Sequence, residues 1–164
     1  MRMPSLIVAW LLLSCPAAAQ TPIEIDRTLQ KVYGTAVMSS DVRQAKMLRL
    51  LTPAAENDGA VQTALENRLL ILHEAARSGL EDPTPAQIAD RKKAWLSSWP
   101  PGTDVPKLLE RGGMSDRALD GWFRDDLRID AYLQSRFNQQ DQKRDERVAE
   151  WLRDLRHRAN LPIK

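Results

Sequence analysis

Cysteine is nearly absent from this chain, since Cys15 is the only one among its 164 residues. It lies in an apolar N-terminal segment with the features of an export signal, so a processed chain forms no disulfide and carries no thiolate chemistry. Histidine is scarce as well: His73 and His157 are far apart, and no H-E-x-x-H pattern pairs them on one helix. We expect both histidines to be structural and the protein to hold no metal.

Motifs for catalysis are also missing. The chain has no G-x-S-x-G elbow and no glycine-rich phosphate loop. Asp125 and Asp126 are neighbours on a predicted helix, so they point about 100° apart and cannot converge on one substrate atom. Asp126 and Asp130 share a face, but arginines flank them, which favours a solvated charged face. We therefore predict that the chain is not an enzyme and needs no cofactor.

Charge of one sign is lacking too. The formal net charge is +2, which gives no electrostatic case for binding nucleic acid or an acidic membrane. Hydrophobic residues make up 43% of the chain, and its length suits one domain with a real core.

The N-terminus, Met1–Ala19, has the pattern of a secretory signal peptide. Arg2 supplies the positive start, Leu6–Leu13 the apolar core, and Ala17–Ala19 a cleavage site before Gln20. The apolar run is far below the roughly 20 residues that a membrane-spanning helix requires. We expect export to the periplasm and a mature domain of residues 20–164.

Cys15 provides an alternative to simple cleavage. The residues Leu12-Leu13-Ser14-Cys15 loosely resemble a lipobox, in which the cysteine becomes the lipidated first residue of an envelope lipoprotein. Leucine is not the usual residue before the small one, and Pro16 would follow the lipidated cysteine. These two features favour cleavage after Ala19 over a lipid anchor.

The mature sequence predicts an all-α domain of about six helices around a buried central helix. Capping residues, proline breaks and apolar spacing place helices at 39–51, 61–80, 85–99, 115–137 and 141–159, with a short one that starts at Thr103 or Asp104 and ends at 112. Ser115 is expected to begin the helix at 115–137. The central one is 61–80, because Leu69–Leu72 is apolar on every side. Its solvent-facing edge is predicted to be Glu66, Arg68, Glu74 and Arg77.

Three local expectations accompany this plan. Ser39 or Ser40 should cap the first helix, and Thr84 and Gln87 should form a capping box at the third. Gly121, inside a helix, suggests close packing there. The segment Ile23–Val37 alternates as a small β-element with a turn at Gly34-Thr35.

Several of these segments together resemble the N-terminal chaperone domain of the SurA family of periplasmic chaperones. The resemblance covers roughly Ile25–Phe137, and a C-terminal segment, Trp151–Ala159, is similar to the terminal helix of that family. The residues that carry it are Tyr33-Gly34-Thr35-Ala36-Val37, Ser39-Ser40-Asp41-Val42, Leu65-Glu66-Asn67-Arg68-Leu69-Leu70, Thr84-Pro85-Ala86-Gln87-Ile88 and Trp122-Phe123-Arg124-Asp125-Asp126-Leu127-Arg128.

The resemblance implies both a topology and a function. The helix at 141–159 would pack back on the N-terminal part, and Leu161–Lys164 would add a strand to Ile23–Val37. The family's parvulin isomerase domains are absent, because Phe137 is joined to the last helix by a few polar residues. The implied function is ATP-independent binding of unfolded exported or outer-membrane proteins in an apolar groove. The alternatives are an envelope adaptor with one defined partner and, less favoured, a prolyl isomerase.

The aromatic residues near the helix breaks are the candidate client-binding residues. They are also candidates for the core, which we favour, and Trp99 is expected to be more exposed than Trp95. The candidates are Trp95, Trp99, Met114, Trp122 and Phe123.

The leader gives the first testable prediction. Mass spectrometry of the exported protein should find a mature chain that begins at Gln20, because Ala17–Ala19 is the better processing site. A mature chain that begins with a lipidated Cys15 would contradict it.

Overall fold

Six helices and one two-stranded sheet form the described part of the chain, in a computed structural model that describes residues 26–51, 57–137 and 142–162. The mainly helical class with a small β-element is confirmed, whereas the predicted leader, with Cys15, lies outside the described residues. Within the three described ranges, no helix has the length and apolar character to cross a membrane. In chain order the elements are β1 (Thr28–Val32), β2 (Thr35–Met38), α1 (Ser39–Met47), α2 (Asp58–Ala75), α3 (Pro85–Ser97), α4 (Val105–Gly112), α5 (Asp116–Arg136) and α6 (Arg144–Arg158).

The two strands form a tight antiparallel hairpin. Val32 pairs with Thr35, which leaves Tyr33 and Gly34 as a two-residue loop, one position earlier than predicted. Both loop residues have positive φ, 47° and 88°, as a type I′ turn requires. The inner side chains Val32 and Val37 are almost fully buried and connect the hairpin to the helical core.

The start of α1 differs from the sequence prediction. Ser39 and Ser40 do not cap the helix; their hydroxyls donate to the carboxylate of Asp26, which also accepts the Ser40 backbone N–H at 2.9 Å. Asp41 accepts the backbone N–H of Met38 at 2.8 Å. The bonds from the Ser40 and Ser39 hydroxyls, and then from the Ser40 backbone, lower the pKa of Asp26 to about 2. An acidic residue from outside the helix thus satisfies its first turn.

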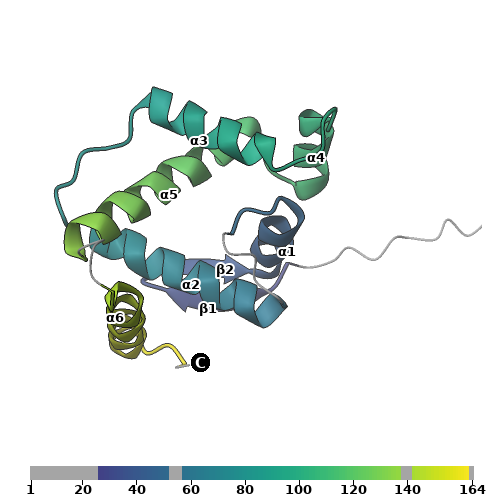
Figure 1. Ribbon diagram of the computed structural model, residues 1–164. Helices are drawn as coiled ribbons and strands as arrows, with labels where there is room; N and C mark the ends of the chain where they lie inside the picture. Colours follow the sequence, from purple (N-terminus) through teal and green to yellow (C-terminus); the bar gives the residue numbers. More distant parts are fainter. Residues whose placement is uncertain (1–25, 52–56, 138–141, 163–164) are drawn as a thin grey trace, which may run out of the picture.

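The long helix α2 lies at the centre of the molecule, as predicted. It packs against α1, α5, α6 and both strands, and Figure 1 shows α5 converging on the end of α2 near which α6 also lies. One apolar cluster joins α2 to β2 and α1, and a second joins it to β1, α5 and α6. A third, here called the α3–α5 cluster, comprises Leu48, Leu50, Ile88, Trp95, Leu109, Met114, Leu119 and Phe123.

The predicted solvent-facing edge of α2 is wrong for Glu66 and Arg68, which are both buried. Glu66 is 1% exposed and forms an ion pair of 2.7 Å with Arg156 of α6, which is 4% exposed. Arg156 also donates to Asn67 Oδ1 and to the Pro162 carbonyl, each at 2.9 Å. Gln62 donates to the second Glu66 oxygen at 2.8 Å. Every charged group of this buried site is therefore hydrogen-bonded, which makes its burial tolerable.

The C-terminal segment packs against the hairpin without joining its sheet. Asn160, with a φ of 53°, turns the chain back after α6, and Leu161 N–H donates to the Arg156 carbonyl at 2.9 Å. Leu161 is 5% exposed and belongs to the same cluster as Val32 and Leu155. The predicted strand is therefore wrong for Leu161 and Pro162, and the rest of it lies outside the described residues.

The starts of the later helices follow the predicted capping residues. Thr84 Oγ1 accepts the Gln87 backbone N–H at 3.3 Å, and Gln87 Oε1 accepts the Thr84 N–H at 2.8 Å, which is a complete capping box. Asp104 and Ser115 cap α4 and α5 by accepting backbone N–H groups, each at 3.1 Å. These local signals place α3, α4 and α5 along the chain.

Close packing occurs at a different glycine from the one predicted. A Cβ added at Gly121 would meet nothing within 4 Å, whereas one at Gly112 would lie 3.0 Å from the Leu48 side chain. Gln44 Nε2 also donates to the Gly112 carbonyl at 2.9 Å. The end of α4 therefore lies directly against α1, and Gly112 permits that approach.

The buried ion pair gives a stability prediction. Arg156→Met should lower the free energy of unfolding by about 3–5 kcal/mol, because it leaves the Glu66 carboxylate buried without its partner. The double variant Glu66→Met with Arg156→Met should recover most of this loss. Urea denaturation measures both, and Arg153→Met on the exposed side of α6 is the matched control. A double variant as unstable as the single one would show that the bonds of Arg156 to Asn67 and Pro162 dominate.

Candidate functional site: an apolar surface at the junction of α3 and α4

The junction between α3 and α4 is short and rich in proline. After α3 ends at Ser97, the chain passes through Trp99 and Pro100-Pro101-Gly102, and α4 begins at Val105. Proline lacks a backbone N–H and so cannot continue the helix, and Gly102 takes a φ of 81° in the turn. The prolines thus end α3 and leave an apolar loop between α3 and α4.

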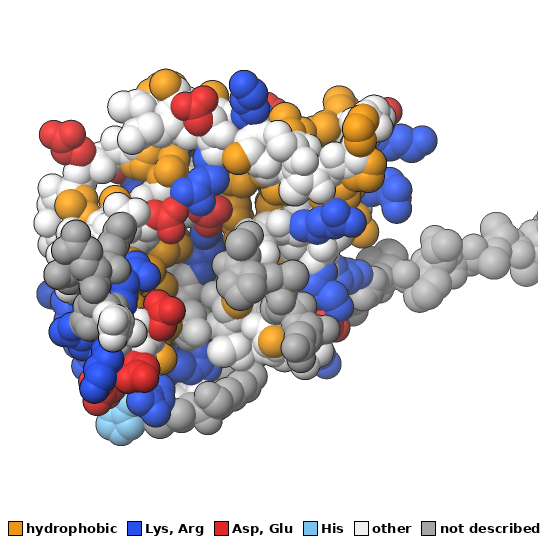
Figure 2. All heavy atoms as spheres, viewed as in Figure 1, with side chains coloured by type: hydrophobic (Ala, Val, Ile, Leu, Met, Phe, Trp, Pro, Cys, Tyr) orange, Lys and Arg blue, Asp and Glu red, His pale blue; other side chains and the backbone are white. Residues whose placement is uncertain are grey.

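Two shallow pockets meet at this loop and share Val105. Their volumes are about 400 and about 370 Å³. Figure 2 shows hydrophobic side chains gathered at the upper right, where Figure 1 places the end of α3 and α4. We call this area the α3–α4 surface and define it by the apolar side chains Leu96, Trp99, Pro100, Pro101, Val105 and Pro106.

The sequence-predicted binding residues come together in and around the α3–α5 cluster, and Trp99 is also part of this surface. Trp95, Met114 and Phe123 are buried members of the α3–α5 cluster, and Trp99 and Trp122 pack against it with partial exposure. The ring centroids of Trp95 lie 5.8 Å from those of Trp99 and 5.9 Å from those of Phe123. Direct contact with a partner remains a prediction for Trp99 and Trp122; contact with the other three would require the core to open.

Trp95 fixes the base of the surface. Its indole Nε1–H donates to the Leu48 carbonyl at 2.8 Å, in a buried hydrogen bond between α3 and the end of α1. The neighbouring Trp99 ring therefore rests on a fixed support, and the surface is formed in advance of any binding.

Arginine side chains lie over the other three tryptophans of the described chain. The guanidinium carbons of Arg49, Arg68 and Arg136 are 4.4, 3.9 and 5.2 Å from the ring centroids of Trp99, Trp122 and Trp151 respectively. Such cation–π contacts contribute about 0.5–2 kcal/mol, according to how far they are desolvated.

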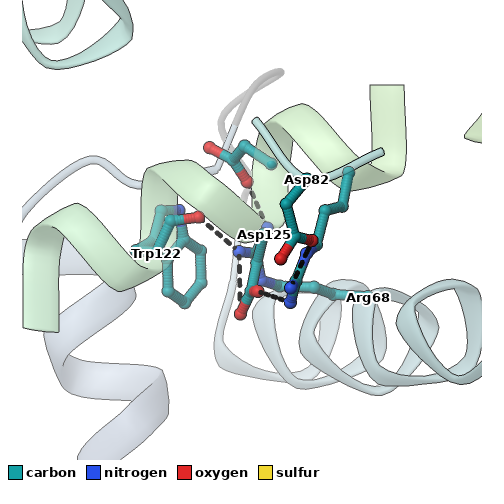
Figure 3. A network of polar contacts seen from close by, with 6 residues as sticks. Arg68, Asp82, Trp122 and Asp125 are labelled. Atoms are coloured by element: carbon teal, nitrogen blue, oxygen red, sulfur yellow. Dashed lines mark hydrogen bonds and ion pairs between the residues drawn. The ribbon is translucent and has the colours of Figure 1, made fainter. Parts of the chain in front are cut away.

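The contact of Arg68 with Trp122 belongs to a larger polar network, which Figure 3 shows from close by. Arg68 donates to the Trp122 carbonyl at 2.7 Å, forms a close ion pair with Asp126, and lies 4.0 Å from Asp125. Burial raises the pKa of Asp126, and the Arg68 charge opposes that shift. Asp126, which we predicted to lie on a solvated face with Asp130, instead joins α5 to α2, whereas Asp130 remains partly exposed.

The same network reaches the segment between α2 and α3. Arg128 of α5 pairs with Asp82 at 2.6 Å and with Asp125 at 3.5 Å. Arg91 of α3 pairs with Asp130 at 2.5 Å. These contacts hold α3 against α5 and so set the position of the α3–α4 surface.

Some of the cations around the α3–α4 surface are paired with carboxylates and others are not. Lys92 bridges Asp116 and Asp120 at 2.6 and 2.9 Å. Partial burial acts to lower the pKa of Lys92, but the two carboxylates outweigh burial and raise that pKa above its usual value. Lys93 lines the pocket beside the α3–α4 loop, which no carboxylate of the described chain lines, whereas Glu110 and Asp116 line the other pocket. Arg49, over Trp99, has no carboxylate partner in the described ranges.

Sequence reasoning missed several residues of this surface. Leu96 is 36% exposed. It directly follows the buried Trp95 on α3 and lies one turn before Pro100, so the helical spacing could have indicated that Leu96 is an apolar residue on the outer face. Arg49 had none, because its place over Trp99 depends on the packing of α1 against α3. Its φ of 49° is a further tertiary feature that no local pattern indicated.

Another pocket lies between α2, α5 and the segment that follows α2. Its volume is about 290 Å³, and its floor is formed by Leu72, Ala75 and Ala131 beneath the Asp82–Arg128 ion pair. Its side chains include no nucleophile paired with a base. Among the described residues, no group of three or more His, Cys, Asp or Glu side chains is arranged to hold a metal ion.

Comparison of the chain with protein-family models, with curated proteins and with solved structures found no match in any of the three. The candidate surface is therefore judged on its own geometry and chemistry.

The stability of single variants can test which side chains belong to the α3–α4 surface and which to the α3–α5 cluster. Leu96→Ser should change the free energy of unfolding by no more than about 0.5 kcal/mol, because the side chain is exposed. Phe123→Ala should cost about 3–5 kcal/mol, because it opens a cavity in the α3–α5 cluster. Urea denaturation compares the two, with Leu80→Ser as a control of similar exposure elsewhere. A Leu96→Ser variant as unstable as Phe123→Ala would show that this leucine belongs to the core.

Proposed function

We propose that the protein is an extracytoplasmic, ATP-independent chaperone-like protein that binds unfolded or partly folded exported and outer-membrane proteins at the α3–α4 surface. The observation that carries the proposal is the open apolar surface formed by Leu96, Trp99, Pro101 and Val105 on a rigid support. Contiguous exposed apolar side chains of this kind mark sites of protein–protein interaction. The resemblance of the sequence to the SurA chaperone domain supports the same function, and the export signal predicted for residues 1–19 supports a periplasmic location.

The shape of the surface suits reversible binding of varied sequences. Trp99 and the prolines present flat, stiff contacts that lose little conformational entropy when a chain segment lies on them. Because the two pockets are open and mainly apolar, they impose little preference among apolar side chains. Binding must also release the client, and affinities on the order of micromolar, about −8 kcal/mol, fit that need.

A single-partner adaptor of the envelope is the second candidate. The observation that favours it is the limited extent of the α3–α4 surface, in which two pockets share one residue. A small patch fits one complementary partner as well as it fits short segments of many clients. Behaviour toward unrelated unfolded proteins separates the two candidates.

Suppression of aggregation is the direct test. The mature protein, at a near-equimolar ratio and without nucleotide, should reduce light scattering when a urea-denatured outer-membrane protein is diluted into buffer. The variants Leu96→Ser and Leu96→Ser with Pro101→Ser should protect less well at an unchanged melting temperature, because they remove apolar contacts from an exposed site. Leu80→Ser, 42% exposed in its wild-type form, should protect normally.

Other outcomes would change the assignment. Unchanged scattering with several unrelated clients would contradict the chaperone function and favour the adaptor. A faster prolyl cis–trans step, whose uncatalysed time is roughly tens to hundreds of seconds, would instead favour the isomerase alternative.

A further inference from the structure

Two cations border the α3–α4 surface near Trp99, one over its ring and one in the pocket that Trp99 lines. The guanidinium of Arg49 lies 4.4 Å from the centroid of the Trp99 ring. Lys93, one turn before Ser97, lines the pocket that Trp99 also lines. Both side chains are on exposed residues, so a bound segment over Trp99 would pass close to a positive charge.

The surroundings of these cations contrast with those of similar residues nearby. Arg68 has the same placement over Trp122, but Asp126 pairs with it. Lys92, the neighbour of Lys93, is held between two carboxylates of α5. In the described chain Arg49 and Lys93 have no such carboxylate, so their charges remain available to a partner.

Arg49 is also held in place by its backbone. It follows α1 with a φ of 49°, a left-handed conformation that is uncommon for residues other than glycine and asparagine. Its N–H donates to the Lys46 carbonyl at 3.2 Å, and the next residue, Leu50, donates to the Ala45 carbonyl at 3.0 Å. The turn directs the chain so that Leu50 enters the α3–α5 cluster while Arg49 stays outside, over Trp99.

We infer that the α3–α4 surface selects polypeptide segments in which a carboxylate lies next to apolar residues. The apolar residues contact Leu96, Trp99 and Val105, and the carboxylate is held by Arg49 and Lys93. This inference rests on the proposed function, since it names the chemistry of the segment that the same surface takes.

The positive charges of Arg49 and Lys93 determine which polypeptide segments bind best at this surface. A carboxylate near Arg49 gains charge-assisted hydrogen bonds without displacing an existing partner. A lysine or arginine in the same place would meet two like charges, which suppresses binding. Because the site is open to solvent, the preference should be modest and should weaken as salt screens it.

Three labelled peptides test the inference with the mature protein. They share one unstructured apolar sequence and carry, beside its apolar residues, two aspartates, two asparagines or two lysines. Fluorescence anisotropy at low salt should show the aspartate peptide binding about fivefold more tightly than the asparagine peptide, and the lysine peptide binding least. The difference should shrink in about 0.3 M salt, where the Debye length is well below 10 Å.

Charge-removing variants assign the preference to the named residues. Arg49→Gln and Lys93→Gln should each reduce the advantage of the aspartate peptide and leave affinity for the asparagine peptide within about twofold. Arg153→Gln is the matched control, because it removes one exposed charge on α6, far from α4 in Figure 1. Circular dichroism and urea denaturation confirm that each variant is folded.

The outcomes are distinguishable from a failure of the proposed function. Binding of none of the three peptides, together with unchanged client scattering, would overturn the function itself. Equal binding of the aspartate and asparagine peptides would overturn the inference alone. A preference for aspartate that survives both Arg49→Gln and Lys93→Gln would also overturn it, because the charge would then act elsewhere.

Discussion

The structure depends on two charged residues buried in its most apolar helix. Glu66 and Arg68 are two positions apart, so their side chains leave α2 about 200° apart, on nearly opposite sides. Glu66 binds Arg156 of α6, and Arg68 binds Asp126 and the Trp122 carbonyl of α5. The central helix therefore holds α6 on one side and α5 on the other through specific polar contacts. Apolar packing alone would allow the neighbouring helices to slide; the ion pairs fix their register.

This arrangement also positions the candidate site. The α3–α4 surface makes little direct contact with α2, since α3 packs on α5. Its orientation follows from a chain of contacts: Arg68 fixes α5, Arg91 pairs α3 with Asp130 of α5, and Trp95 bonds the end of α1. A surface of partly exposed tryptophan and exposed proline can thus remain ordered without a partner, because its support is built from hydrogen bonds and ion pairs.

Much of the helical plan was predictable from local signals, and the charged contacts were not. Thr84 with Gln87, Asp104 and Ser115 begin their helices as expected, because a cap depends on residues a few positions away. Glu66 and Arg68 were predicted to face solvent, because the partners that allow their burial lie 90 and 58 positions away in the sequence. Arg49 likewise acquires its role only when α1 meets α3. Among the predicted binding residues, the sequence indicated that aromatics cluster at the helix breaks, and its prediction that Trp99 is more exposed than Trp95 is confirmed.

One feature of the C-terminal segment bears on how the chain folds. Val32, near the start of the described residues, is covered by Leu155 and Leu161, near their end. The Pro162 carbonyl further supplies a hydrogen-bond acceptor that the buried Arg156 needs. The hairpin and central helix therefore have no complete core until almost the whole described chain is present. During synthesis, the cluster that joins the hairpin, the central helix and α6 would therefore be completed only after the last helix and Leu161 have emerged, whereas the cluster of β2, α1 and α2 could form earlier.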